Sequence, residues 1–301
     1  MKRLAVMLTM FAALLGARAA SAQPAGKKLS IAIFAPNAPF PSGNDRFNFV
    51  QRLAQQITSA AGVPAEGKAF ARAADLEAAI KAKQVDFAVI DGVYLAETGV
   101  RYGVMAIATT GGETSPKWAL FSATVGSVQE LQGKRLSRAT AAAGRDDAFI
   151  ENGIFDGELQ VKKFFAGTST APDIVSAITA VSLKKADAVV APESEGKGMK
   201  NIFEAGRIPN PAFCEVAAGL SNDLVAKVKQ AVLSHGAAAT LDGWKAGDAG
   251  PYRALAGRLG VRAKRPVMSE PEVVKMEDLD ILVPPSLEFA LPELKTQFWM
   301  P

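Results

Sequence analysis

The sequence predicts an α/β protein made of two halves of similar construction. Runs typical of β-strands alternate with helical patterns from Leu29 onward, and a break at 111–116 separates two such series. The chain has 301 residues, of which 49% are hydrophobic, so it can form one large domain or two modest ones with real cores. Alternation of strands and helices favours parallel strand pairing with right-handed crossovers.

The first half follows this alternation closely. We expect strands at 29–34, 67–70, 86–90 and 104–109 and helices at 45–60 and 75–83. Phe49, Leu53 and Ile57 are spaced by four and fall on one helix face, and Asp75 is placed to cap the second helix. The strand at 86–90 runs directly into a turn that opens a further helix.

The second half repeats the pattern. We expect strands at 119–124, 134–138, 161–165 and 187–191 and helices at 142–152 and 173–182. After the Pro-rich stretch at 208–211, the pattern predicts a strand at 213–218 and a helix capped by Ser221. Residues 243–259 have a helical pattern that Gly250-Pro251 interrupts. The prolines of 265–301 predict an extended tail instead of a compact domain.

Residues 1–22 have the features of a signal peptide. Lys2 and Arg3 supply a positive start, an apolar run of about twelve residues follows, and Ala20-Ser21-Ala22 matches the small-x-small cleavage pattern. A membrane-spanning helix needs roughly 20 apolar residues, and neither this run nor any later segment reaches that length. We therefore expect cleavage and export to the periplasm, without a lipid anchor or a membrane span in the mature chain.

The charge balance argues against a polyanionic partner. Of the 34 basic residues, three lie in the signal peptide (Lys2, Arg3 and Arg18), which leaves 31 basic against 30 acidic residues. A net charge of +1 provides no general attraction for nucleic acid or for an anionic membrane surface. Any anion site must therefore be local.

The sequence lacks the residue groups that catalysis usually needs. Cys214 is the single cysteine and lies in a partly buried strand pattern, where a small core residue is the simpler interpretation. His235 is the single histidine, which excludes a site built on several histidines and disfavours a Ser-His-Asp triad. No Gly-x-x-x-x-Gly-Lys-Ser/Thr loop occurs. We predict a binding protein without metal or cofactor, and not an enzyme.

Several segments together resemble a known family. They are the strand 29–34 with the long helix behind it, the helix 75–83 followed by Val85–Tyr94, the segment Leu131–Leu136, and Ala186–Val190 followed by Ile208–Pro211. In order and spacing, over roughly 29–259, they resemble the type 2 periplasmic binding proteins of ABC importers. The chain is most similar to the branch that binds phosphonate, phosphite and related oxyanions.

This resemblance implies a two-lobed α/β fold with a hinge of two crossing segments. Lobe one would comprise 23–111 plus 213–264, lobe two 112–212, and 265–301 would be the tail. The ligand would lie between the lobes, where strand carboxyl ends meet helix N-termini whose N–H groups suit an oxyanion. The resemblance further implies a monomer that delivers a small anionic ligand to an ABC transporter permease.

Two turns of lobe one supply candidate ligand-binding residues: Asn37, Phe40, Ser42, Asp91, Gly92 and Tyr94. Similar proteins contact the ligand with the loop after the first strand, which implies that Phe40 lines the cleft and that Asn37 and Ser42 donate hydrogen bonds. Gly92 lets the backbone approach a ligand, and Tyr94 offers a ring and a hydroxyl. The alternatives are a rigid proline connector and an ordinary strand–helix turn with Tyr94 packed into the lobe.

The candidates in lobe two are Arg138, Thr140, Ala141, Ala142 and Glu193. Phosphonate binders carry a Ser/Thr-rich turn at this place, whereas here only Thr140 keeps a hydroxyl and three alanines follow it. The change removes donors that a phosphonate dianion needs. Arg138 can compensate by pairing with a carboxylate or phosphate, unless it lies on a solvated surface. Glu193 can bind an amine or hydroxyl, or cap a helix.

Two functions compete on this basis. The first is solute capture for an ABC-type importer. The second is a sensory or partner-binding module that reuses the clamp without transport, which the alanine-rich turn and the long tail suggest.

Overall fold

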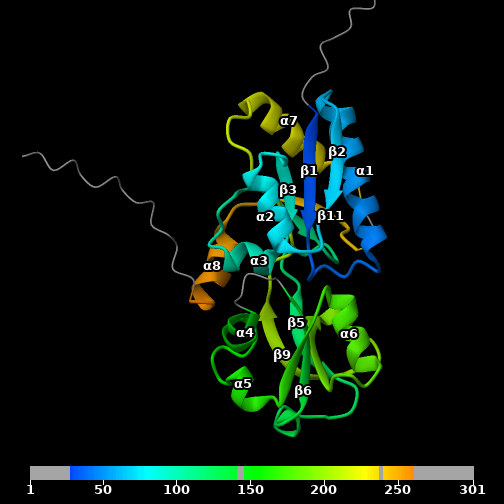
Figure 1. Cartoon of the computed structure of the whole chain (residues 1–301), viewed down its shortest axis with the longest axis vertical. Coiled ribbons are helices and arrows are strands. Elements are labelled where there is room, and N and C mark those ends of the chain that lie inside the picture. Colours follow the sequence, from blue (N-terminus) through cyan, green and yellow to red (C-terminus); the bar gives the residue numbers. More distant parts are fainter. Residues whose placement is uncertain (1–27, 141–145, 237–239, 261–301) are drawn as a thin grey trace, which may run out of the picture. The chain divides into compact units, whose positions relative to one another are not determined.

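The computed structural model describes residues 28–140, 146–236 and 240–260, which form two mixed β-sheets flanked by helices (Figure 1). The predicted signal peptide, the predicted tail at 265–301 and the candidates Ala141 and Ala142 lie outside these residues. The α/β class predicted from the sequence is confirmed, whereas the residue boundaries of the two lobes stay a prediction.

Six strands form the first sheet, in the order β11-β4-β10-β3-β1-β2. They are β1 (Leu29–Phe34), β2 (Ala65–Ala69), β3 (Phe87–Ile90), β4 (Gly103–Thr109), β10 (Ala212–Glu215) and β11 (Gly243–Ala246). Strand β1 pairs in parallel with β2 and β3. Strand β10 pairs antiparallel with both β3 and β4, and β11 pairs antiparallel with β4. Within this sheet, the expected parallel pairing therefore holds for β1, β2 and β3 and not for the other strands.

Helices cover both faces of this sheet. They are α1 (Gly43–Ala61), α2 (Ala73–Lys81), α3 (Gly92–Glu97), α7 (Asn222–Leu233) and α8 (Gly250–Arg258). Ile31 and Ile33 point to the face that α1 and α7 cover, while Ala32 and Phe34 point to the face of α2, α3 and α8. Every residue of β1 is buried, as expected for a strand between two helical layers.

Five strands form the second sheet, in the order β7-β6-β8-β5-β9. They are β5 (Lys117–Ser122), β6 (Arg135–Ala139), β7 (Gly167–Ala171), β8 (Ala188–Pro192) and β9 (Lys200–Arg207). Helix α6 (Ile174–Ser182) covers one face through Ile174, Ala177 and Val181. Shorter elements complete this half: η1 (Gln129–Leu131), α4 (Asp146–Ala148), the π-helical turn η2 (Phe149–Ile154), α5 (Val161–Phe164) and η3 (Glu193–Glu195).

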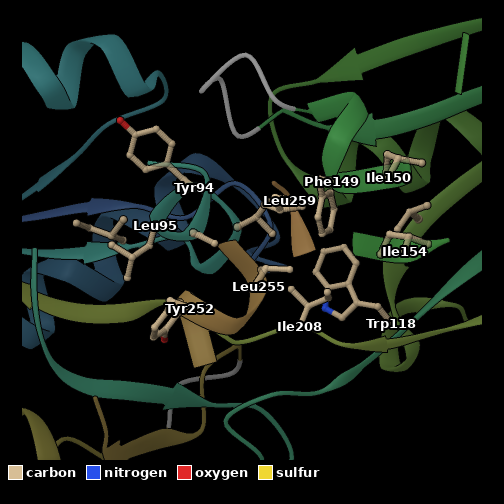
Figure 2. Packing of buried hydrophobic residues seen from close by; sticks show 14 of the residues in the cluster. Tyr94, Leu95, Trp118, Phe149, Ile150, Ile154, Ile208, Tyr252, Leu255 and Leu259 are labelled. Atoms are coloured by element: carbon tan, nitrogen blue, oxygen red, sulfur yellow. The ribbon is translucent and has the colours of Figure 1, made fainter. Parts of the chain in front are cut away.

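One hydrophobic cluster runs from the α8 face of the first sheet to the η2 face of the second. Figure 2 shows Leu255 of α8 and Leu259, the residue that ends this helix, beside Phe149 of η2, with Trp118 of β5 next to them. The Trp118 and Phe149 rings meet edge to face, with centroids 5.7 Å apart. The two halves therefore share buried apolar surface in addition to the chain segments that join them.

Two short segments carry the chain between the sheets, 110–116 on the way out and 208–211 on the way back. They are hydrogen-bonded to each other, because Ile208 N donates to Pro116 O at 3.2 Å and Asn210 N donates to Thr114 O at 2.9 Å. The predicted hinge of two crossing segments is thus confirmed.

Some predicted elements are wrong. The pattern at 161–165 predicts a strand, but α5 occupies 161–164, because the apolar positions 161, 164 and 165 also fit the spacing of one helical face. The strand β7 follows instead. Helix α2 begins at Ala73 after Arg72, and Asp75 lies in its first turn instead of capping it. The first part of 243–259 is β11, and Pro251 starts α8 instead of breaking a helix.

Within the described part of the chain, every helix is too short or too polar to cross a bilayer.

Candidate functional site

A small cavity lies where the crossing segments meet the start of α3. Its lining residues come from the first loop, the β3–α3 turn, the crossing segments and the second sheet: Asn37, Pro39, Asp91, Gly92, Val93, Thr110, Pro116, Trp118, Pro192, Ile208, Pro209, Asn210 and Pro211. The centre of a water molecule can move within about 20 Å³ there, which is about the room that one water needs. A larger guest therefore requires the two halves to part.

Asp91 organises one wall of this cavity. It is fully buried, caps α3 by accepting from Val93 N at 2.9 Å and Tyr94 N at 3.3 Å, and accepts two bonds from Asn37. Burial raises the pKa of its carboxyl group, although these donors act in the opposite direction. The N–H groups at the start of α3, which the sequence suggested for a ligand oxyanion, are therefore already used by Asp91.

Gly92 brings α3 into direct contact with the returning segment. A Cβ atom at this position would lie 2.0 Å from Pro209 O and 3.0 Å from Asn210 O, both backbone atoms. The close approach predicted for Gly92 was to a ligand, and the group that approaches it here is the chain's own backbone.

Asn210 fixes the returning segment. Its side-chain Nδ2 lies within hydrogen-bonding distance of Ala108 O at 3.1 Å, Thr110 Oγ1 at 3.3 Å and Glu113 O at 3.0 Å, and its own carbonyl accepts from Tyr252 at 2.8 Å. With Trp118 it provides the polar and aromatic groups that the sequence analysis missed. Only the prolines on either side of Asn210 marked the segment, because its partners come from distant parts of the chain.

The candidates Phe40 and Ser42 lie away from the cavity lining. Phe40 is buried against Phe49, with ring centroids 5.4 Å apart, in the core under α1. Ser42 caps α1 by accepting from Asp45 N at 3.2 Å and is exposed. Both residues hold the loop and the helix that follows it.

Tyr94 also points elsewhere. Its hydroxyl donates to Glu77 Oε1 at 2.5 Å in a separate hollow, where Arg101 and Tyr102 contact the same oxygen. Burial and the Glu77 carboxylate raise the pKa of Tyr94. Its role in the structure is to tie α3 to α2.

We expect Tyr94→Phe to lower the free energy of unfolding by about 1–2 kcal/mol, because it removes a hydrogen bond to a carboxylate and keeps the ring. Urea unfolding measures this loss. The affinity for a solute in the cavity should stay unchanged. A tenfold weaker solute affinity in a folded variant would contradict this and indicate that Tyr94 contributes to solute binding.

The candidates of the second half lie in three environments. Arg138 is mostly buried at the end of β6 and donates to Asp147 at 2.6 Å, and Thr140 lies 3.2 Å from Asp146. Glu193 lines a different hollow of about 330 Å³, which Arg207 also lines. The structure does not bring these residues together with Asn37 and Asp91.

Cys214 and His235 are structural. Cys214 lies in the core strand β10, where burial raises the pKa of its thiol and disfavours a thiolate nucleophile. His235 packs edge to face on Phe49 at 5.9 Å. Among the described residues, His, Cys, Asp and Glu form no group of three or more that could hold a metal ion.

Solved structures with this fold bind small molecules. A binding-protein component of an ABC phosphonate transporter from Pseudomonas aeruginosa is similar with a TM-score of 0.60 and 13% identity, over 79% of this chain and 89% of that chain. PhnD1 from Prochlorococcus marinus, in complex with methylphosphonate, has a TM-score of 0.61 and 11% identity, over 78% and 99%. XAC2383 from Xanthomonas citri, bound to chloride ion, has a TM-score of 0.55 and 11% identity, over 77% of this chain and 97% of that chain.

No family model and no curated protein sequence matches the chain. At these identities the structural likeness establishes the fold, which is the two-lobed α/β fold of type 2 periplasmic binding proteins that the sequence predicted.

Proposed function

We propose that this protein is the periplasmic solute-binding component of an ABC-type importer and that it captures a small anionic solute between its two halves. The observation that carries the proposal is the position of the cavity. Its walls come from both halves and from both crossing segments, so a change in the angle between the halves would open or close it. A guest held there would touch both halves at once and stabilise the closed arrangement.

The fold and the chemistry of the wall support this proposal. The Prochlorococcus protein with this fold is bound to methylphosphonate, and the Xanthomonas protein is bound to chloride. In the present chain, Thr110 and Asn210 supply polar groups and Trp118 supplies an apolar wall. Because the cavity has about 20 Å³ of free space, we expect solute entry to need opening about 110–116 and 208–211.

A thermal-shift screen of the purified protein tests the proposal, with phosphate, phosphite, methylphosphonate, acetate, sulfonates and amino acids as probes. A solute at 100 times its dissociation constant stabilises the folded state by about 2.7 kcal/mol, and we expect a rise in Tm of roughly 5 °C. A neutral sugar and a simple amine serve as negative controls. A folded sample that no anion stabilises would contradict anion capture.

The small size of the cavity favours one second function, a sensory or partner-binding module that works in the closed form. Its apolar cluster joins the two halves directly. This function predicts stable binding to a receptor ectodomain that Asn210→Ala leaves unchanged, whereas the transport function predicts that Asn210→Ala weakens solute binding. A pull-down and the thermal-shift screen on the same variant separate the two.

A further inference from the structure

Arg46 is a buried cation on the apolar face of α1. It lies one helical turn before Phe49 and Val50 on the stripe that continues through Leu53 and Ile57, and it is 6% exposed. A guanidinium group at such a position is unusual, because arginine is almost never buried unless it is paired. Its surroundings therefore need an explanation.

The pairing of Arg46 within the described residues is incomplete. Its Nη2 lies 3.6 Å from Asp173 Oδ2, which is an ion pair but beyond hydrogen-bonding distance. Its Nε is buried and has no hydrogen-bond partner there. The exposed pair of Arg72 and Asp75, by contrast, makes two hydrogen bonds of 2.8 Å. Arg46 thus bears the cost of burial without the bonds that normally compensate it.

The position of Arg46 links the two halves of the protein. Asp173 belongs to the second half, where it caps α6 by accepting from Ser176 N at 2.8 Å. Next to it, Ile174 N donates to Pro36 O at 2.8 Å, so the N-terminus of α6 rests on the first loop. The neighbouring residue of that loop, Asn37, lines the cavity and is bonded to Asp91.

Two carboxylates act on this one cation. The charges of Asp173 and Asp91 both favour the charged form of Arg46, while burial lowers the pKa of its guanidinium. The Asp91 carboxylate accepts four hydrogen bonds from its own half, and none of these four comes from Arg46. Among the described residues, the Asp173 carboxylate is held by its cap and by the loose ion pair alone, so it is the partner that a stronger anion can replace.

We infer that Arg46 is the residue that binds the anionic group of the solute, and that Asp173 occupies its guanidinium until the solute arrives. This inference rests on the proposed function and adds its missing counter-charge. Arg46 and Asp173 lie behind the cavity lining: Asp173 pairs with Arg46, and its neighbour Ile174 is bonded to Pro36, next to the lining residue Asn37. A solute therefore reaches Arg46 only when the halves part and Asp173 moves away. The planar guanidinium suits carboxylate, phosphate and phosphonate groups, whose oxygens can accept from Nε and Nη2 together. A solute held in this way would contact Arg46 of the first half and take the place of Asp173 of the second half.

The test measures the affinity of three proteins for the anion that stabilises the wild type in the panel of phosphate, phosphite, methylphosphonate and acetate. Arg46→Met keeps the unbranched apolar part of the side chain without the charge and should weaken binding at least about thirtyfold, as the loss of a buried charged partner does. Asp173→Asn keeps the helix cap, since Asn caps as well as Asp. It removes the competing charge and should tighten binding about tenfold. Arg72→Met is the matched control and should change nothing.

The outcomes separate the inference from the function. Weaker binding by Arg46→Met with tighter binding by Asp173→Asn supports the inference. Equal affinity of wild type and Arg46→Met for the anion overturns the inference and leaves solute capture intact. An equal loss of affinity in Arg46→Met and Asp173→Asn also overturns it, because it indicates a structural ion pair. If no anion binds wild type or Asp173→Asn, the inference fails, and a neutral or cationic solute found by the screen would preserve solute capture. If Arg46→Met does not fold, Arg46→Gln, which is polar but neutral, replaces it, and unchanged affinity in Arg46→Gln overturns the inference.

Discussion

Gly92→Ala is expected to destabilise the protein by about 3 kcal/mol or more, the largest effect we expect from adding a single methyl group. The new Cβ would lie 2.0 Å from Pro209 O, and a backbone oxygen cannot move aside as a flexible side chain does. Pro209 lies between Ile208, which is hydrogen-bonded to Pro116, and Asn210, which is bonded to Thr114. The clash would therefore push α3 away from the segment that connects the two halves. Chemical denaturation measures the loss.

Gly257→Ala in α8 is the matched control, because a Cβ there meets nothing within 4 Å. Alanine in a helix interior is better than glycine by roughly 0.5–1 kcal/mol, so this variant should be slightly more stable than wild type. If Gly92→Ala were as stable as Gly257→Ala, the contact between α3 and Pro209 would be contradicted. The crossing segment would then be looser than its hydrogen bonds indicate.

The turn around Gly92 was predictable because its information is local. A buried strand, an acid, a glycine and a helix follow one another within ten residues, and the structure has β3, Asp91 as the cap, Gly92 and α3 in that order. The same local rules identified Ser221 as the cap of α7, whereas Ser42, which was expected to contact the ligand, caps α1. These local rules do not predict which group packs against the turn, and in the structure this group is the backbone oxygen of Pro209.

The rest of the site depends on strand pairing between distant segments. Strand β10 lies between β3 and β4, which brings Asn210 beside Ala108 and Thr110, about a hundred residues earlier in the chain. Periodicity within either segment does not specify this register. Lobe-two candidates such as Arg138 were chosen from a turn that resembles one in phosphonate binders, and their partners here are the acids of α4.

Arg46 is a residue for which the sequence did hold a signal. Residues 46, 49, 50, 53 and 57 all lie on the buried stripe of α1, and only the first is charged. A cation at an apolar position of an amphipathic helix marks a partner that the helix alone does not supply. The apolar residues alone predict the helix, and they assign no role to this charged exception. The partner, Asp173, comes from the opposite half and was not identifiable from local patterns.

The second large effect is expected from Leu259→Ala, which should lower the free energy of unfolding by about 2–5 kcal/mol. Leu259 is 2% exposed at the end of α8, and a Cβ placed on Gly153 of η2 would lie 3.5 Å from its Cδ2. It thus packs across the two halves, as Figure 2 shows beside Phe149. Because the lost contact joins α8 to η2, the halves should separate more easily than in wild type. Hydrogen exchange of the amides at 149–154 measures this separation.

Leu53→Ala provides the comparison, because Leu53 is fully buried in the cluster under α1, which belongs to the first half alone. Truncation there should cost a similar free energy of unfolding, since the same atoms are removed from a packed core. It should leave the local opening of 149–154 as it is in wild type, because no contact to η2 changes. Equal protection of these amides in the two variants would mean that the apolar cluster does not hold the halves together. Faster exchange in Leu259→Ala alone would identify the contact of Leu259 with η2 as one that holds the two halves together.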